Sequence, residues 1–195
     1  MGKIFCLTGK SASGKDAIYQ RLMADEATGL LPVVSYTTRP IRDGEEEGRE
    51  YHFCSLSQME QMEAQGRLIE RRTYHTVHGD WHYFTADDGQ IGLSEHSYLM
   101  VATPEQVHSL RAYFGSAAVA AVFIYVEDGE RLERALRRER KQEQPKYAEL
   151  CRRFLADEAD FAPEKLAEAG IEDVIENVDL MQTLADVRDW IGKAL

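Results

Sequence analysis

A glycine-rich loop near the N-terminus has the composition of a phosphate-binding site. Residues 9–16 read Gly-Lys-Ser-Ala-Ser-Gly-Lys-Asp, after an apolar run at 3–7 and at the start of an amphipathic segment that runs from Gly14 to about Asp25. Between a strand and a helix, such glycines let backbone N–H groups face one centre, and the helix dipole adds positive potential there. The loop therefore predicts ATP binding, with Lys15 placed for the β- and γ-phosphates; the alternative is a turn that only caps a helix. The expected ATP-binding residues are Gly9, Ser11, Ala12, Ser13, Gly14, Lys15 and Asp16.

Asp16 stands where the Walker A pattern has Ser or Thr. The usual hydroxyl ligates Mg²⁺, and a carboxylate is also a hard oxygen donor that Mg²⁺ accepts. We therefore expect Mg²⁺ as the cofactor and Asp16 as its ligand, with a tight dependence on the metal. The alternative is that Asp16 only benefits from the positive end of the helix.

A second chemically distinctive segment spans residues 35–53. It reads Ser-Tyr-Thr-Thr-Arg-Pro-Ile-Arg-Asp-Gly-Glu-Glu-Glu-Gly-Arg-Glu-Tyr-His-Phe. Two arginines three apart, Arg39 and Arg42, can grip phosphate oxygens in a bidentate manner, and the phenol of Tyr51 can add one hydrogen bond. The segment predicts an anion clamp; a solvated charged loop is the alternative.

The elements that must position these residues follow from hydrophobic periodicity. Apolar runs alternate with amphipathic segments, which predicts a parallel sheet of about five strands flanked by helices, the three-layer α/β fold of P-loop NTPases. The polar stretch 37–97 interrupts this alternation and looks like an inserted lobe. A capping box at Ser57–Glu60 and a helix start at Thr103–Gln106 mark two helices. The expected strands lie at 3–7, 31–36, 97–102, 119–126 and 171–176, and further helices at 128–143, 146–161 and from 179.

Residues 9–16 and 35–53 together resemble the guanylate kinase family. That family carries T-T-R-x-x-R-x-G-E-x-x-G-x-x-Y-x-F shortly after its phosphate loop, and the resemblance extends to Leu68-Ile69-Glu70 and, more weakly, to the C-terminal third. It implies transfer of the ATP γ-phosphoryl group to GMP, dependent on Mg²⁺, in line and without a covalent intermediate. It also implies one domain over 1–195, with a core formed by 1–34, 98–133 and 157–195, an acceptor-binding lobe at 35–97 and a lid at 134–156.

The resemblance assigns roles residue by residue. Glu70 could accept hydrogen bonds from both donors of the guanine edge, or it could be a surface charge at a strand end. The lid arginines could reach the transferring phosphoryl group, or form helix-face pairs such as Glu133–Arg137. Asn177 is similar to the family's Asn beside the ATP base. The implied GMP-binding residues are Ser35, Arg39, Arg42, Tyr51, Glu70, Tyr83 and Thr85, and the implied catalytic residues are Lys15, Arg138 and Arg153.

One part of the family pattern is missing. The third strand usually ends in an Asp-x-Asp pair, but here the corresponding positions are Val101 and Thr103. We hypothesise that the carboxylate on the magnesium side has moved to Asp16. Two other functions stay open: a kinase for another phosphorylated acceptor such as ribose 1,5-bisphosphate, whose kinases often carry Gly-Lys-Asp, and a non-catalytic guanylate-kinase-like binding module.

Composition limits the remaining possibilities. The chain has 195 residues, and 34 acidic against 23 basic side chains give a net charge of −11, which excludes a non-specific nucleic-acid coat. Three distant cysteines without a C-x-x-C pair favour a reducing cytoplasm, and no apolar run is long enough to predict a membrane span. The expected partners are ATP and GMP, without nucleic acid or membrane, and the chain is a monomer or homodimer. We interpret His75, His78 and His82 as a pocket wall rather than a metal site.

Overall fold

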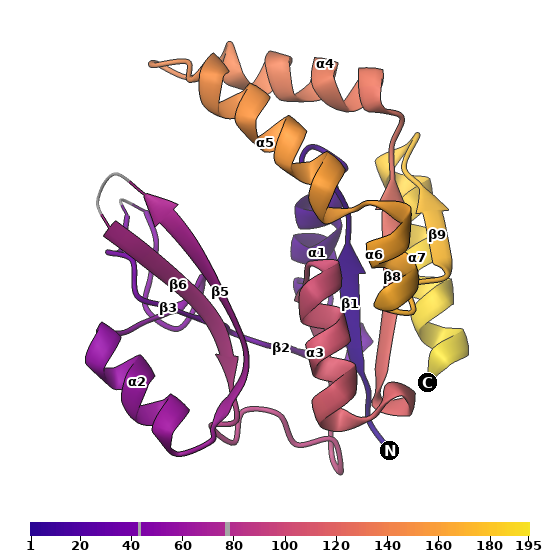
Figure 1. The fold of residues 1–195 in the computed structure, drawn as a ribbon. Coiled ribbons are helices and arrows are strands. Elements are labelled where there is room, and N and C mark those ends of the chain that lie inside the picture. The colour runs from indigo at the N-terminus through magenta and orange to yellow at the C-terminus, as the bar shows by residue number, and fades with distance from the viewer. Residues whose placement is uncertain (43, 77–78) are drawn as a thin grey trace.

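The computed structural model describes residues 1–42, 44–76 and 79–195, which form two sheets and a helical lid (Figure 1). The larger sheet has five parallel strands in the order β2-β7-β1-β8-β9. This confirms the predicted fold class. The strands are β2 (Leu30–Pro32), β7 (Ser97–Val101), β1 (Ile4–Thr8), β8 (Val119–Tyr125) and β9 (Asp173–Glu176).

Helices cover both faces of this sheet because its central strands are apolar on both sides. Ile4 and Cys6 point to the face covered by α3 and α6, whereas Phe5 and Leu7 point to the face covered by α1 and α7. This alternation is the two-residue period of a strand. The helices are α1 (Lys15–Met23), α3 (Pro104–Phe114), α6 (Pro163–Glu168) and α7 (Leu180–Ala194), with short 3₁₀ turns at Glu26–Thr28 and Ser116–Ala118.

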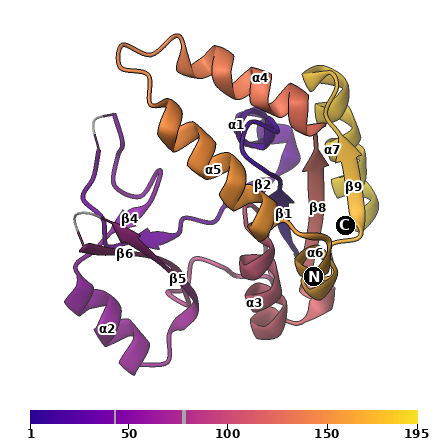
Figure 2. The ribbon, with the colours of Figure 1, turned by 45° about the horizontal axis from the view of Figure 1, so that its top comes forward.

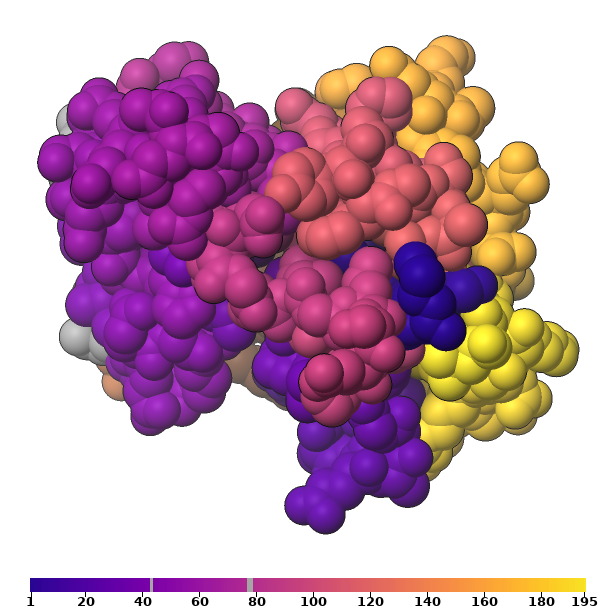
Figure 3. Space-filling model, turned by 90° about the horizontal axis from the view of Figure 1, so that it is seen from below, coloured from indigo at the N-terminus to yellow at the C-terminus, as the bar shows by residue number. Residues whose placement is uncertain are grey.

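The inserted segment folds as a separate lobe with its own sheet. Its strand order is β4-β3-β6-β5, and α2 packs against this sheet through Met59 and Phe84. The lobe stands beside the core as a distinct mass in the view from below (Figure 3). Its elements are β3 (Tyr36–Thr37), β4 (His52–Phe53), α2 (Leu56–Ala64), β5 (Leu68–Thr76) and β6 (Gly79–Ala86).

The prediction of a single strand at 31–36 is wrong. The chain leaves the core sheet after Pro32 and enters the lobe sheet at Tyr36, so two short strands in different sheets replace one. Continuous apolar character does not reveal this, because a run of apolar residues gives no signal of where the chain passes from one sheet to another. The capping box of α2 is also shifted, since Ser55 and Gln58 form it in place of Ser57 and Glu60.

The lid consists of two helices that reach over the N-terminal end of α1 (Figure 2). They are α4 (Asp128–Glu139) and α5 (Tyr147–Asp160), and they pack against each other. Helix α4 ends at Glu139, four residues before the predicted end at 143. Thr103 begins α3 as expected, with a capping box to Gln106, and Asp179 caps α7. In the described part of the chain, no helix is both long enough and apolar enough to cross a membrane.

Candidate active site

The glycine-rich loop joins β1 to α1, as the sequence predicts. Gly14 has φ +88° and precedes the first residue of α1, Lys15. Asn177, at the end of β9, lies beneath the loop and donates from Nδ2 to the Ser13 carbonyl at 2.7 Å, while its Oδ1 accepts from Thr183 at 3.0 Å. The loop is therefore held in its curled conformation from the core side. Both polar ends of the Asn177 amide are used within the protein.

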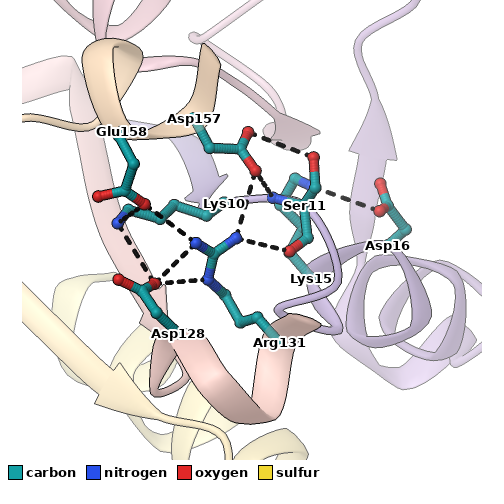
Figure 4. A network of polar contacts seen from close by, with 8 residues as sticks. All are labelled: Lys10, Ser11, Lys15, Asp16, Asp128, Arg131, Asp157 and Glu158. Atoms are coloured by element: carbon teal, nitrogen blue, oxygen red, sulfur yellow. Dashed lines mark hydrogen bonds and ion pairs between the residues drawn. The ribbon is translucent and has the colours of Figure 1, made fainter. Parts of the chain in front are cut away.

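Two residues that the sequence interpretation missed fasten the loop to the lid (Figure 4). Asp157 of α5 accepts from the Ser11 N–H at 2.8 Å and from the Ser11 hydroxyl at 3.2 Å. Arg131 of α4 is only 1% exposed; it donates to the Ser11 carbonyl at 3.1 Å and to Asp157 at 3.3 Å. The sequence held one signal for the role of Arg131: Asp128 and Arg131 are three residues apart on a helix, a spacing that indicates an ion pair on one helix face.

Further charged side chains complete this network. Lys10 Nζ lies 3.4 Å from Asp128 and 2.6 Å from Glu158, and Arg131 Nη2 contacts both of the same carboxylates at 2.7 and 3.2 Å. The hydrogen bond from Arg131 lowers the pKa of the Asp128 carboxyl group. Lys10 is therefore a structural cation, and Lys15 is left as the loop lysine that lines the cleft between core and lobe.

The two proposed catalytic arginines of the lid, Arg138 and Arg153, line one small cavity of about 190 Å³ together with Ser11. Arg153 donates to Glu149 at 2.8 Å, and Arg152 contacts the same carboxylate. The hydrogen bonds from these two arginines, chiefly those from Arg152, lower the pKa of Glu149 to about 2. Arg137 pairs with Glu133 at 2.9 Å on the exposed face, as the alternative interpretation allowed. Arg138 and Arg153 thus face one cavity between the lid helices, and Ser11 is the residue of the phosphate loop that lines it.

Arg39 of the predicted anion clamp is bound within the lobe. Arg39 is 3% exposed, forms a bidentate ion pair with Glu45 at 2.7 and 2.6 Å, and donates from Nε to the Tyr83 hydroxyl at 3.1 Å. Its guanidinium group lies over the ring of Tyr51, 5.1 Å from the centroid. The hydrogen bonds from Arg39 lower the pKa of Glu45 to about 2. Glu45 was not predicted, although it is part of the quoted motif.

The pocket beside this clamp has a volume of about 330 Å³ and collects four arginines from the lobe and the lid. Arg42 contributes to it and lies 5.9 Å from the ring centroid of Trp81. Its lining residues are Arg42, Tyr51, Arg72, Tyr74, Trp81, Tyr83, Glu149, Arg152 and Arg153. Arg42, Tyr51 and Tyr83 therefore share this pocket with the predicted lid arginine Arg153, whereas Arg39 does not line it.

The residues expected to read the base form a buried polar cluster. Glu70 Oε1 accepts from the Thr85 hydroxyl at 2.9 Å, and Ser35 Oγ lies 3.4 Å from Thr85 Oγ1. Two residues that were not predicted also contact Glu70: Gln106 donates to Oε1 at 3.1 Å, and Arg72 donates to Oε2 at 3.2 Å. Glu70 is 6% exposed, so the interpretation of this residue as a surface charge is wrong.

One cleft of about 820 Å³ connects the loop to the lobe. Lys15 and Asp16 line it on the core side, and Ser35 and Tyr51 on the lobe side. Val101 and Thr103 also line it at the end of β7, so the positions without carboxylates do face the cleft. The Asp16 side chain is 72% exposed, and one of its oxygens lies 3.4 Å from Lys15 Nζ. Asp16 is thus available to a ligand.

Across residues 1–42, 44–76 and 79–195, no group of three His, Cys, Asp or Glu side chains is arranged to hold a metal ion. His75 pairs with Asp80 at 2.7 Å, and His82 contacts Thr73 at 2.9 Å. His78 lies outside the described residues. Cys6 is buried in the core, and this burial raises the pKa of its thiol to about 12.

A glycine-rich loop between the first strand and first helix of a parallel sheet, opposite an arginine-lined lobe, defines the P-loop nucleotide-binding fold. The guanylate kinase family model matches residues 1–194. The chain belongs to the guanylate kinase family.

Individual relatives agree with this membership. A guanylate kinase of Neisseria gonorrhoeae is 38% identical over 97 residues, which are 50% of this chain and 45% of that protein. The match therefore spans less than half the length of that relative. A guanylate kinase of Alkalilimnicola ehrlichii is 29% identical over 188 residues, 96% of this chain and 86% of that one. The crystal structure of guanylate kinase from Anaplasma phagocytophilum has the same fold, with a TM-score of 0.69 at 19% identity, covering 98% of this chain and 85% of that one.

Proposed function

We propose that the protein transfers the γ-phosphoryl group of ATP to GMP and releases ADP and GDP. The observation that carries this proposal is the single cleft in which the phosphate loop faces the lobe: Lys15 and Asp16 line one side, and Ser35 and Tyr51 the other. Two sites that share one cleft suit a transfer between two bound molecules, because holding both reactants in place lowers the entropic cost of their reaction.

The proposed roles follow from charge and position. Lys15 and the N-terminus of α1 hold the ATP phosphates, and Arg39, Arg42, Tyr51 and Tyr83 hold the acceptor phosphate. An oxygen of the acceptor's own phosphate attacks the γ-phosphorus, so no protein nucleophile is required. Phosphoryl transfer needs positioning and charge neutralisation above all.

The lid arginines supply the neutralising charge in this proposal. Arg138 and Arg153 line the cavity beside Ser11 and stabilise the charge that spreads over the equatorial oxygens of the transferring group. Closure of lid and lobe excludes water, which would otherwise hydrolyse ATP. The reaction is in line and has no covalent intermediate.

Mg²⁺ is the proposed cofactor, and the residues present fit it. Asp16 offers an exposed carboxylate in the first turn of α1, next to Lys15. Mg²⁺ is usually held by one or two carboxylates plus substrate phosphates rather than by an all-protein cage. When bound, it would act as a Lewis acid that neutralises charge on the phosphates. The exposed Cys151 supports a reducing compartment, and we propose the cytoplasm, with a monomer or homodimer acting on free nucleotides.

A coupled ADP-release assay tests the proposal. The acceptors are GMP, dGMP, AMP, UMP, CMP and ribose 1,5-bisphosphate, each with ATP and Mg²⁺. We expect ADP release with GMP. Lys15→Ala should lower the rate of this reaction by a factor on the order of a hundred or more, and Glu70→Ala should lower it by a smaller factor. Lys10→Ala is the matched control, because that lysine is held in the lid network and does not line the cleft.

Ribose 1,5-bisphosphate is included for a specific reason. Arg72, Arg152 and Arg153 share the lobe pocket with Arg42, so four arginines line it against one carboxylate, Glu149, which pairs with Arg152 and Arg153. Such a pocket could accept a second phosphate group. Turnover of ribose 1,5-bisphosphate alone would replace the GMP assignment. ATP binding without transfer to any acceptor would favour a binding module instead.

A further inference from the structure

Arg72 lies where the cleft, the lobe pocket and a further cavity meet. It belongs to β5, the edge strand of the lobe sheet that faces the core (Figure 1). Its side chain lines the cleft of about 820 Å³, the pocket of about 330 Å³ and a cavity of about 310 Å³ beside the start of α3. A positive charge at this junction therefore acts on both the cleft and the pocket.

The pairing of β5 with β6 places Arg72 among the residues proposed to hold the acceptor phosphate. Arg72 is opposite Tyr83 in the antiparallel register, and Tyr74 is opposite Trp81. Because alternate residues of a strand share one face, Arg72 and Tyr74 lie on the same face of the sheet. The Tyr83 hydroxyl oxygen accepts from Arg39, so its hydrogen stays available as a donor. Arg72 and Tyr83 are thus neighbouring donors in one pocket.

Most of the hydrogen-bonding capacity of the Arg72 guanidinium group is unused. Its Nε donates to Glu70 at 3.2 Å, but across residues 1–42, 44–76 and 79–195 neither of its Nη atoms has a hydrogen-bond partner. The side chain is 16% exposed, so this cation is largely withdrawn from bulk water. A guanidinium group with both Nη atoms free can bind an oxyanion through two parallel N–H bonds.

The lid arginines that share the pocket with Arg72 are already paired. Arg152 and Arg153 both donate to Glu149, at 2.7 and 2.8 Å. Arg42 is exposed at the other side of the pocket. Arg72 is therefore the arginine of this pocket that is both withdrawn from solvent and has both Nη atoms available to a ligand.

The carboxylates that line the cleft do not neutralise Arg72. The end of β7, which shares the cleft with it, carries the neutral side chains of Val101 and Thr103. Asp160 lines the cleft and the further cavity together with Arg72, yet no ion pair joins the two within the part of the chain that the structure describes. The charge of Arg72 is thus directed at the space between the lobe and the phosphate loop.

We infer that Arg72 binds the phosphate group of the acceptor, beside Arg42 and Tyr83, and holds it where the lobe pocket opens into the cleft that Lys15 lines. This inference rests on the proposed function. It adds a phosphate ligand from β5 that the motif at 35–53 does not contain. An acceptor phosphate held at this junction has oxygens directed toward the cleft, which is the side from which the γ-phosphorus must be reached.

Equilibrium binding of GMP and of guanosine to the full chain, measured by isothermal titration calorimetry, tests this inference, and the coupled assay measures turnover in parallel. Arg72→Met should raise the Kd for GMP about tenfold through loss of charge-assisted hydrogen bonds, while the Kd for guanosine, which has no phosphate, should stay within about twofold. Arg72→Gln keeps a neutral donor for Glu70, and it should weaken GMP binding as much as Arg72→Met does. The KM for ATP should not change.

Arg71→Met is the matched control. Arg71 is the neighbour of Arg72 on β5, but it pairs with Glu63 of α2 at 2.9 Å and lines neither the cleft nor the pocket. This variant should leave both Kd values unchanged.

The other outcomes separate the inference from the proposed function. Equal losses for GMP and guanosine in Arg72→Met would mean that Arg72 acts through Glu70, and they would overturn the inference. An unchanged Kd for GMP in Arg72→Met or in Arg72→Gln would also overturn it. GMP binding that depends on Arg72 without any turnover would overturn the proposed function alone. Absence of GMP binding to the wild-type protein would overturn both.

Discussion

The Asp157 carboxylate binds Ser11 twice, accepting from its backbone N–H at 2.8 Å and from its hydroxyl at 3.2 Å. A lid residue thus contacts the phosphate loop directly. Arg131 joins the same carboxylate at 3.3 Å and is almost completely buried. The position of the lid and the shape of the loop are therefore coupled through these three residues.

Removal of the Asp157 carboxylate should destabilise the protein measurably. Asp157→Ala leaves the buried Arg131 with Asp128 and Glu158 only, so we expect a loss of about 2 to 4 kcal/mol in the free energy of unfolding. Asp157→Asn keeps an acceptor for the Ser11 N–H and should lose about half as much. Urea denaturation measures both. Glu133→Ala, which removes an exposed ion pair on α4, is the control and should cost less than about 1 kcal/mol; an equal cost would contradict the coupling.

Gly14 should not tolerate a side chain. A Cβ there would lie 2.4 Å from Asn177 Nδ2, and φ is +88°. Gly14→Ala should therefore raise KM for ATP at least about tenfold, because the loop is displaced. Gly89 has the same φ, and a Cβ added there would meet no atom within 4 Å. Gly89→Ala therefore measures the cost of the backbone conformation alone, about 1 kcal/mol of unfolding free energy.

A double-mutant cycle separates the two contributions at Gly14. In an Asn177→Ala background, Gly14→Ala should cost only as much unfolding free energy as Gly89→Ala does, since the steric conflict is gone. An undiminished cost in that background would show that Asn177 is not the residue that excludes a side chain at position 14.

Asp16→Ser should lower activity although it restores the usual Walker A residue. The end of β7 carries Val101 and Thr103, and the carboxylate next to Lys15 is that of Asp16, at 3.4 Å. Glu50, Asp157 and Asp160 also line the cleft. We expect kcat to fall on the order of tenfold or more at saturating Mg²⁺, and the Mg²⁺ concentration for half-maximal activity to rise. Asp16→Asn keeps the shape and removes the charge, and should behave like Asp16→Ser. Activity of Asp16→Ser equal to wild type would refute the transferred role of this carboxylate.

The lobe should lose stability in acid through Glu45. Its pKa is lowered to about 2 by the hydrogen bonds from Arg39, against 4.5 for an ordinary glutamate. A carboxyl group with a lowered folded-state pKa contributes its full stabilisation above the unfolded value and loses it as the pH falls toward the folded value. The difference in Tm between wild type and Glu45→Gln should therefore be constant above about pH 5 and vanish near pH 2. Glu46→Gln, an exposed neighbour paired with Arg49, should show a smaller difference at neutral pH.

The sequence predicts those parts of the molecule that follow from local patterns. Strand β8 is an almost unbroken apolar run, so its place inside a parallel sheet can be inferred from composition, and β1 lies next to it. The phosphate loop and the anion clamp are contiguous motifs. Gly9, Ser11, Lys15 and Asp16 of the loop line the cleft, and Arg42, Tyr51 and Tyr83 of the clamp line the pocket beside it, whereas Arg39 lines neither. Glu70 and Thr85 meet because β5 and β6 pair in the register that puts them opposite each other.

The contacts that the sequence does not predict join segments that are distant along the chain. Ser11 and Asp157 are 146 residues apart, and Glu70 and Gln106 are 36 apart. Each of these side chains has an ordinary local explanation, such as a helix cap for Gln106 or a solvated helix face for Asp157. Only the approach of α5 to the phosphate loop and of α3 to β5 of the lobe gives them their second partner.

The two connections between core and lobe are themselves tied together. Gln90, on the returning connection, accepts from the Val34 N–H at 2.8 Å and donates to the Val34 carbonyl at 3.2 Å on the outgoing one. The chain therefore leaves the core and returns to it at one place, where a side-chain amide binds both backbone groups of Val34. Two contacts from α3 attach the same side of the insertion at other points, from Gln106 to Glu70 at 3.1 Å and from Tyr113 to Asp87 at 2.7 Å. A change at any of these three attachments would thus be felt along the whole wall of the cleft that the lobe forms.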